Sequence, residues 1–401
     1  MFCKKLERVL HVEATDIRPL YLNQLQEDEI RSLAQILEDN ALLTDEMYSD
    51  IIHKGIGDFV KDDCKASFSN LLLKLFEASS IKKKLESLYK GLESMQNEKI
   101  KKVVIFSLLK NVSNYDLSFY EILDLFCADY IALMRNDIEF MAEIFIQDED
   151  GINVRSSIIS LELIKSIIKI EDIISTMKEA FFAADKKEGQ TYRELQRNMV
   201  SHSQFMLFAN GKNERDQLIW VESFYNDIRN TNFAKHNTFF WEQFASAYID
   251  MKKFDLVKKC IDNALIEAKR TPSFVPFQVK TIQGRYYVEK CYEDLLRGQC
   301  TENEAITAIE NATDAILLYY IHPENNLYYV FKVVRKFSEI YSLVKTTWSK
   351  RELSIYMEKA GIMKRHMDEY LKNEMAPYYE KVEMWRQNIE ATLQDAKSRI
   401  K

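Results

Sequence analysis

Glycine and proline are scarce in this sequence. The chain of 401 residues contains 9 glycines and 5 prolines, where average usage would give roughly 28 and 20. Neither residue occurs between Gly91 and Gly151. Sheets joined by tight turns need many positions with positive φ, whereas helix interiors disfavour both glycine and proline. The scarcity therefore predicts an all-α protein.

Charge and cysteine content indicate the class of partner and the cellular compartment of the chain. The net charge of −7 does not favour a nucleic-acid partner. No stretch approaches 18 apolar residues, and the opening MFCKKLERVL carries charge through its apolar part, unlike a signal peptide. The cysteines form no C-x-x-C pair. We therefore expect a cytoplasmic chain with no membrane partner, and we expect its cysteines to be reduced. The six cysteines are Cys3, Cys64, Cys127, Cys260, Cys291 and Cys300.

Residues 1–20 differ from the rest. VLHVEATDI, from Val9, alternates apolar and polar residues as a strand does. One strand cannot satisfy its own backbone hydrogen bonds, so we expect it to complete the sheet of a domain that this sequence lacks. From Asn23 onward apolar residues recur at helical spacing, and short polar breaks such as QDEDG predict a helical bundle that includes residues 152–169.

The C-terminal part contains an internal repeat. A TPR hairpin has bulky residues on its first helix, small residues where its two helices approach, and a proline after the second helix. One unit of this sequence matches the pattern of both helices. Two further units match the pattern of the second helix. Such hairpins bury their faces only against neighbours, so we expect an α-solenoid. The matching residues are Trp241, Phe244, Ala245, Tyr248, Val257, Ile261, Ala264 and Pro272, then Ala305, Ile309 and Ala312, then Leu353, Met357 and Ala360.

Four segments in order resemble the C-terminal portion of bacterial STAND-type P-loop NTPases of the antiviral defence type. HNTFFWEQFASAY, from His236, resembles the stretch that opens their C-terminal repeats. PLYLNQLQEDEIRSLAQILEDNALL, from Pro19, is similar to the small winged-helix-like segment that follows their NTPase core. LLLKLFEAS, from Leu71, and NVRSSIIS, from Asn153, resemble two segments in between.

The resemblance implies a sensor whose helical C-terminus detects a trigger. This sequence has no NTPase core, so ATP hydrolysis is not implied. We expect either a fragment of a longer protein or a chain that works beside a separately encoded NTPase. The predicted division is a strand remnant and winged-helix-like appendage in residues 1–60, a helical linker or bundle in 61–235, and TPR-like repeats in 236–401.

No cofactor or metal motif is present. Gly211–Lys212–Asn213 lacks the upstream glycine and the hydroxyl of a P-loop. RNMVSH, from Arg197 to His202, resembles the R-x4-6-H signature of HEPN ribonucleases, all-α dimers. In such an enzyme Arg197 would stabilise phosphate charge and His202 would transfer protons. The competing interpretation is a solvated helix face with an incidental histidine.

Tyrosines gather in the repeats, where 12 of the 21 lie between Tyr286 and Tyr379. Adjacent residues on a helix diverge by about 100°, so one member of a pair can pack while the other faces a groove. Tyrosine suits recognition because it offers contact area and a hydroxyl. The competing interpretation is that most are ordinary core and boundary residues. The candidate protein-binding residues are Tyr286, Tyr287, Tyr319, Tyr320, Tyr328 and Tyr329.

Together these observations predict a non-enzymatic sensor or scaffold of a STAND-type signalling or anti-phage system, without cofactor or metal. Its partner would be the NTPase or effector portion, or a trigger protein. The alternative is a HEPN-like ribonuclease that uses Arg197 and His202. A third possibility is a TPR regulator that binds a short peptide in its concave face.

Overall fold

A computed structural model gives the structure of the chain, which divides into two compact units, Met1–Gln96 and Asn97–Lys401. The predicted strand in residues 9–17 and most of the predicted appendage lie outside the described residues. The three-part division of the sequence stays a prediction. The structure describes residues 30–32, 57–58, 61, 79–113, 115–129, 141, 144–148, 151–154, 157–209, 214–270, 276–317, 327–373, 376 and 378–400.

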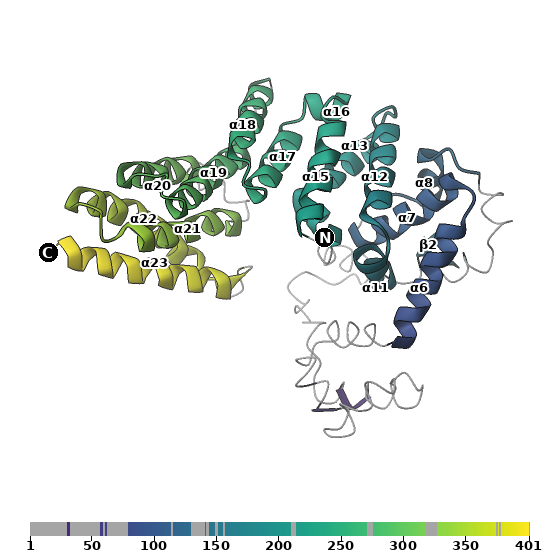
Figure 1. The fold of residues 1–401 in the computed structure, drawn as a ribbon, viewed down its shortest axis with the longest axis horizontal. Helices are drawn as coiled ribbons and strands as arrows, with labels where there is room; N and C mark the ends of the chain where they lie inside the picture. Colours follow the sequence, from purple (N-terminus) through teal and green to yellow (C-terminus); the bar gives the residue numbers. More distant parts are fainter. Residues whose placement is uncertain are drawn as a thin grey trace, which may run out of the picture. The chain divides into compact units, whose positions relative to one another are not determined.

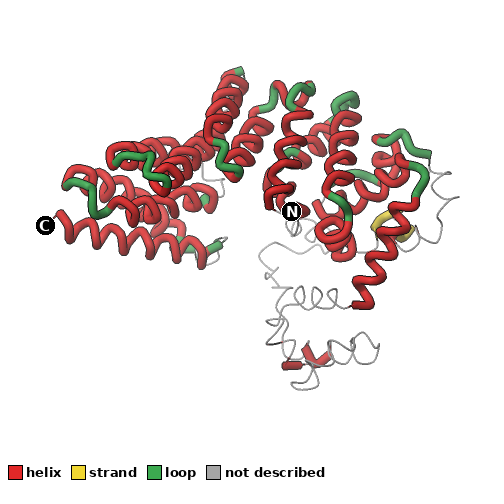
Figure 2. The backbone as a smooth tube through the Cα atoms, viewed as in Figure 1, coloured by secondary structure: helices red, strands yellow, loops and turns green. Residues whose placement is uncertain are grey.

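The described residues are overwhelmingly helical, which confirms the all-α class (Figure 2). The one sheet among them is an antiparallel hairpin of β1 (Phe145–Asp148) and β2 (Gly151–Val154). The expectation that the helix begins at residue 152 is therefore wrong. Gly151 has φ of +115°, which other residues rarely adopt, and it pairs with Asp148. The helix begins only at Ser157.

In the first unit, the helix that is described along its whole length is α6 (Ser79–Ser94). Leu85, Leu88 and Leu92 are buried along one face of α6. Their spacing of three and four residues is that of an amphipathic helix.

In the second unit, α7 (Glu98–Ser113) is the central helix of the N-terminal bundle (Figure 1). Every residue from Val103 to Leu109 is buried, as expected of a helix that is apolar on all sides. Its neighbours are α8 (Phe119–Leu125), α11 (Ser157–Glu162), the π-helix η2 (Leu163–Ile167), α12 (Ile170–Ala184) and β2.

An aromatic core joins this bundle to the C-terminal helices. The elements between them are α13 (Gln190–Met199), α14 (His202–Ala209), α15 (Glu214–Ile228) and α16 (Asn232–Lys235). The ring of Tyr225 on α15 stacks on Phe244 with centroids 4.9 Å apart, and its hydroxyl donates to the carbonyl of Val200. Two helices and the end of α13 are thus fixed by one buried side chain.

The predicted hairpin is formed by α17 (Thr238–Asp250) and α18 (Phe254–Lys269), which pack together along their length. Lys252, with φ of +56°, lies in the turn between them. Trp241, the tryptophan of the predicted repeat pattern, is only half-buried, so it is not a core residue of this hairpin. Phe240, Phe244 and Tyr248 are the buried rings of this helix, and Trp241 lies about 100° around the helix from Phe240.

Five long helices follow, and every second helix along the chain packs against the next one in that series. α19 contacts α17 and α21, and α21 contacts α23, so these helices pack in series, while α20 packs against α19 and α22 (Figure 1). The small residues Ala245, Ala264, Ala312 and Ala360 are fully buried where helices approach. The five helices are α19 (Phe277–Leu296), α20 (Glu302–Leu317), α21 (Tyr328–Val344), α22 (Lys350–Tyr370) and α23 (Tyr379–Ile400).

None of the helices in the described part of the chain combines the length and apolar composition that a membrane-spanning helix requires.

Candidate functional site

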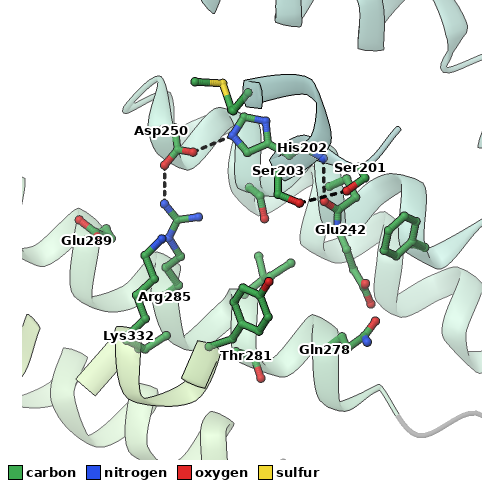
Figure 3. Close-up of a pocket in the computed structure, with 17 residues that line it drawn as sticks. Ser201, His202, Ser203, Glu242, Asp250, Gln278, Thr281, Arg285, Glu289 and Lys332 are labelled. Atoms are coloured by element: carbon green, nitrogen blue, oxygen red, sulfur yellow. Dashed lines mark hydrogen bonds and ion pairs between the residues drawn. The ribbon is translucent and has the colours of Figure 1, made fainter. Parts of the chain in front are cut away.

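A pocket of about 680 Å³ opens between α14, α17, α19 and α21 (Figure 3). Helical spacing explains how four helices line it. Glu242, Ser246 and Asp250 recur every four residues on α17, and Gln278, Arg285 and Glu289 lie along one face of α19. The first turn of α14 and the start of α21 supply the remaining walls.

Three charged or titratable groups on one side of the pocket form a chain of contacts. His202 Nε2 lies 2.7 Å from Asp250 Oδ2, and Arg285 Nη2 contacts Asp250 Oδ1. Burial alone would raise the pKa of Asp250, but the hydrogen bond from His202 and the charge of Arg285 outweigh it and lower this pKa to about 2. Asp250 is therefore an ionised acceptor, so His202 Nε2 carries the proton and donates it.

Lys332 is the cation on this side of the pocket that has no direct ion pair among the described residues, and the carboxylates of Asp250 and Glu289 act on it only from a distance. Arg285 is balanced by Asp250, and Glu289 lies 3.5 Å from Lys336 Nζ. Among the described residues, Lys332 has no carboxylate within salt-bridge distance. Desolvation, together with the charge of Arg285, lowers the pKa of Lys332. A bound anion can therefore form an ion pair with Lys332.

On the other side of the pocket, Glu242 is a buried carboxyl group among amides and hydroxyls (Figure 3). The residue is 2% exposed, and its Oε1 has no hydrogen-bond partner among the described residues. Burial raises the pKa of Glu242 to about 8, and the charge of Arg197 only partly opposes this shift. Glu242 is thus mostly a neutral carboxylic acid at pH 7, able to donate one hydrogen bond.

Arg197 and His202 lie on separate helices, α13 and α14, because α13 ends at Met199. The guanidinium of Arg197 lies over the ring of Phe239, 4.6 Å from its centroid. His202 lines the pocket, and its backbone N–H donates to Gln243 Oε1. The structure therefore places His202 in the pocket and Arg197 against the Phe239 ring beside it.

The tyrosine pairs differ in their surroundings. Tyr286 and Tyr287 are half-buried, and the Tyr287 hydroxyl accepts a hydrogen bond from Gln283. Tyr328 stacks on Tyr378 with centroids 4.0 Å apart, whereas its neighbour Tyr329 is 53% exposed and lines the pocket. Of the described candidate tyrosines, Tyr329 alone lines this pocket. Tyr319 and Tyr320 lie outside the described residues.

Within the described part of the chain, no group of three or more His, Cys, Asp or Glu side chains is arranged to hold a metal ion. The pocket instead offers a cation, a neutral acid and the amides of Gln243 and Gln278. These groups suit the binding of a polar ligand by hydrogen bonds and charge.

No protein-family model matches the sequence, and no curated protein aligns with it significantly.

Sequence reasoning missed most of the pocket residues. A signal was present: polar side chains recur at spacings of three and four residues on α17, a helix whose other faces are apolar. Spacing alone does not distinguish a polar face in a pocket from one in bulk water. The pairing of Asp250 with Arg285, 35 residues later, depends on how two helices pack.

Proposed function

We propose that this chain is a protein-recognition module that binds a peptide segment of a partner in the pocket between α14, α17, α19 and α21. The observation that carries the proposal is the pocket itself, which α14, α17, α19 and α21 line with polar groups. Among the described residues, Lys332 has no salt-bridge partner there and Glu242 Oε1 has no hydrogen-bond partner. Ligand sites between helices commonly combine apolar walls with a few polar groups that fix orientation.

The alternating order of contacts supports a TPR-like α-solenoid. In such a stack each hairpin contacts only its neighbours, and the first helices of successive hairpins line a shared surface. The pocket residues on α17, α19 and α21 belong to the helices that would occupy this position. Tyr329, more than half exposed at the pocket, adds aromatic contact area for a peptide.

The partner system we propose is a STAND-type NTPase of signalling or anti-phage defence. This part rests on the four ordered sequence resemblances. The chain would act as sensor or scaffold without catalysing a reaction, while the NTPase supplies nucleotide hydrolysis. Adding the chain to a P-loop NTPase encoded beside it should change the ATPase rate of that enzyme, and an unchanged rate at saturating concentration would contradict this assignment.

Peptide binding is tested by selecting a randomised phage-displayed peptide library on the purified full chain. Ser246→Trp fills the pocket, because Ser246 is a half-buried lining residue. Ser354→Trp is the matched control on the exposed face of α22. We expect enriched peptides to bind the wild type and Ser354→Trp but not Ser246→Trp. Failure to enrich any peptide, or equal binding to the Ser246→Trp variant, would refute the proposed site.

A further inference from the structure

We propose that the ligand of this pocket is a peptide segment that carries a carboxylate, held by Lys332 and Arg285 while the carboxyl group of Glu242 donates a hydrogen bond to another oxygen of the same segment. This inference rests on the proposed function and names the chemistry of its partner.

The cation of the pocket without an ion pair favours an anion of single charge. Arg285 contacts Asp250, and Glu289 shares Lys336 with Glu339, whereas Lys332 has no carboxylate within salt-bridge distance among the described residues. A carboxylate neutralises its positive charge. A dianionic phosphate would exceed this charge and would also face the carboxylates of Asp250 and Glu289.

Arg285 is held ready for such a ligand. Asp250 fixes its guanidinium, and Asp250 is itself held by His202. A guanidinium has five N–H donors, so contact with Asp250 leaves donors for an incoming carboxylate. Because the side chain is already ordered, binding costs little conformational entropy.

Glu242 provides the second point of recognition. A buried polar atom without a partner is destabilising, and here the unpaired atom belongs to a side chain that lines the pocket. A protonated carboxyl donates to a carbonyl or carboxylate oxygen of the ligand. A cationic ligand is the competing possibility, but it would meet Lys332 and Arg285 in the same pocket.

The charged groups around Glu242 define how pH acts on the site. Arg197 of α13 lowers the pKa of Glu242 but does not outweigh burial. His202 and Lys332 line the same pocket. On α15, Glu222 is paired with Lys253, and the ion-paired Glu267 of α18 contacts Arg270. The remaining charged side chains of α18 are exposed. Ionisation of Glu242 therefore adds a negative charge beside the ligand near pH 8, and the lowered pKa of Lys332 requires a variant that holds the charge of that residue constant.

The test uses two randomised phage-displayed libraries selected at pH 7, one with internal random segments and one with free C-terminal carboxylates. We expect enrichment of Asp and Glu in the internal library, or of any sequence in the C-terminal library alone if the chain terminus supplies the carboxylate. Enriched sequences are then synthesised, and their dissociation constants are measured with the full chain. Lys332→Ala should weaken binding at least tenfold, and the exposed Lys259→Ala of α18 should not.

The role of Glu242 is tested by pH. Wild-type affinity should fall about tenfold from pH 7 to pH 9 as the acid ionises. Glu242→Gln, neutral at every pH, should bind well at pH 7 and lose most of this decline. Lys332→Arg keeps its positive charge up to pH 9, so its affinity should still fall between pH 7 and pH 9. This variant therefore distinguishes the ionisation of Glu242 from loss of the Lys332 proton. Circular dichroism verifies that each variant is folded.

Four results would overturn the inference. They are enrichment of basic or neutral internal peptides, loss of binding in Glu242→Gln at pH 7, a full pH decline in that variant, and displacement of the peptide by inorganic phosphate at millimolar concentration. In each of these cases peptide recognition in the pocket would survive. If neither library yields a peptide that Ser246→Trp abolishes, the proposed function itself fails.

Discussion

His202 Nε2 donates to Asp250 Oδ2 across 2.7 Å, and this contact joins the start of α14 to the end of α17. The histidine is 6% exposed, whereas the Asp250 side chain is 37% exposed, so the hydrogen bond lies at the edge of the pocket. Arg285 reaches the other oxygen of the same carboxylate from α19. One carboxylate therefore connects three helices around the pocket.

The first prediction concerns Asp250 and acid stability. Because its folded-state pKa is lowered to about 2, Asp250 stabilises the fold above its unfolded pKa near 4, and this stabilisation is lost as pH falls toward 2. Asp250→Asn should therefore be less stable at pH 7 and should show a smaller loss between pH 4 and pH 2. Urea unfolding at several pH values measures both. A variant as stable as the wild type at pH 7 would show that the three contacts contribute nothing.

The second prediction concerns Glu242, whose pKa is shifted in the opposite direction. Between the unfolded value of 4.5 and the folded value of about 8, the folded state binds a proton that the unfolded state does not. The free energy of unfolding should therefore decrease with rising pH across this window, by up to about 1.4 kcal/mol per pH unit from this group.

Glu242→Gln is the corresponding variant, because it keeps the shape and removes the titration. Its stability should be flatter than that of the wild type from pH 5 to pH 8, as measured by urea unfolding. Parallel pH profiles for the two proteins would show that Glu242 is ionised in the fold.

The sequence predicts features that depend on neighbouring residues along the chain, and it does not predict those that depend on contacts between residues far apart in the sequence. The scarcity of glycine and proline acts residue by residue, so it predicts the helical class correctly. Ala264 and Ala312 mark close helix approaches through a local pattern, and both are buried as the repeat requires. Trp241 fits the same pattern, but its burial depends on neighbours that the pattern does not specify.

The candidate site depends on longer-range contacts. The spacing of Arg197 and His202 predicts one helical motif, yet the helix ends between them, where the Tyr225 hydroxyl donates to the carbonyl of Val200 from 25 residues away. The buried state of Glu242 likewise depends on the helices packed against α17. No local pattern in a single sequence encodes the hydrogen bond between Tyr225 and Val200 or the burial of Glu242.

The third prediction compares two aromatic residues of α17. Phe244 is 2% exposed and stacks on Tyr225 and Tyr248, so Phe244→Ala should cost about 3–5 kcal/mol. Trp241 is half-buried, and Trp241→Ala should cost distinctly less, on the order of 1–2 kcal/mol, because less apolar area is lost. Chemical denaturation of both variants gives the comparison. A larger effect at Trp241 would restore it as the core residue of the hairpin.

The fourth prediction addresses the ribonuclease alternative. Arg197 stacks on Phe239 and His202 is paired with Asp250, so we expect no metal-independent cleavage of single-stranded RNA by the wild type. Arg197→Ala and His202→Ala should leave the background rate unchanged. Cleavage by the wild type that disappears in both variants, with folding retained, would establish the ribonuclease and displace the recognition module.

The fifth prediction uses two helical glycines as a matched pair. A Cβ atom added at Gly284 on α19 would lie 2.8 Å from Ile316 Cγ2 and 3.3 Å from the carbonyl oxygen of Ala312. At Gly361 on α22, a Cβ atom would have nothing within 4 Å. Alanine in a helix interior is favoured over glycine by about 0.8–1.0 kcal/mol, so that gain applies to both positions and only the surroundings differ.

Gly361→Ala should therefore stabilise the chain by up to about 1 kcal/mol, whereas Gly284→Ala should destabilise it by about 1–3 kcal/mol, because α19 and α20 must separate. Thermal and urea unfolding of the two variants measure the difference. Since α19 also carries Arg285 and Gln278, Gly284→Ala should weaken peptide binding as well, while Gly361→Ala should not. A stabilising Gly284→Ala would mean that α19 and α20 do not approach as closely as Gly284 and Ala312 indicate.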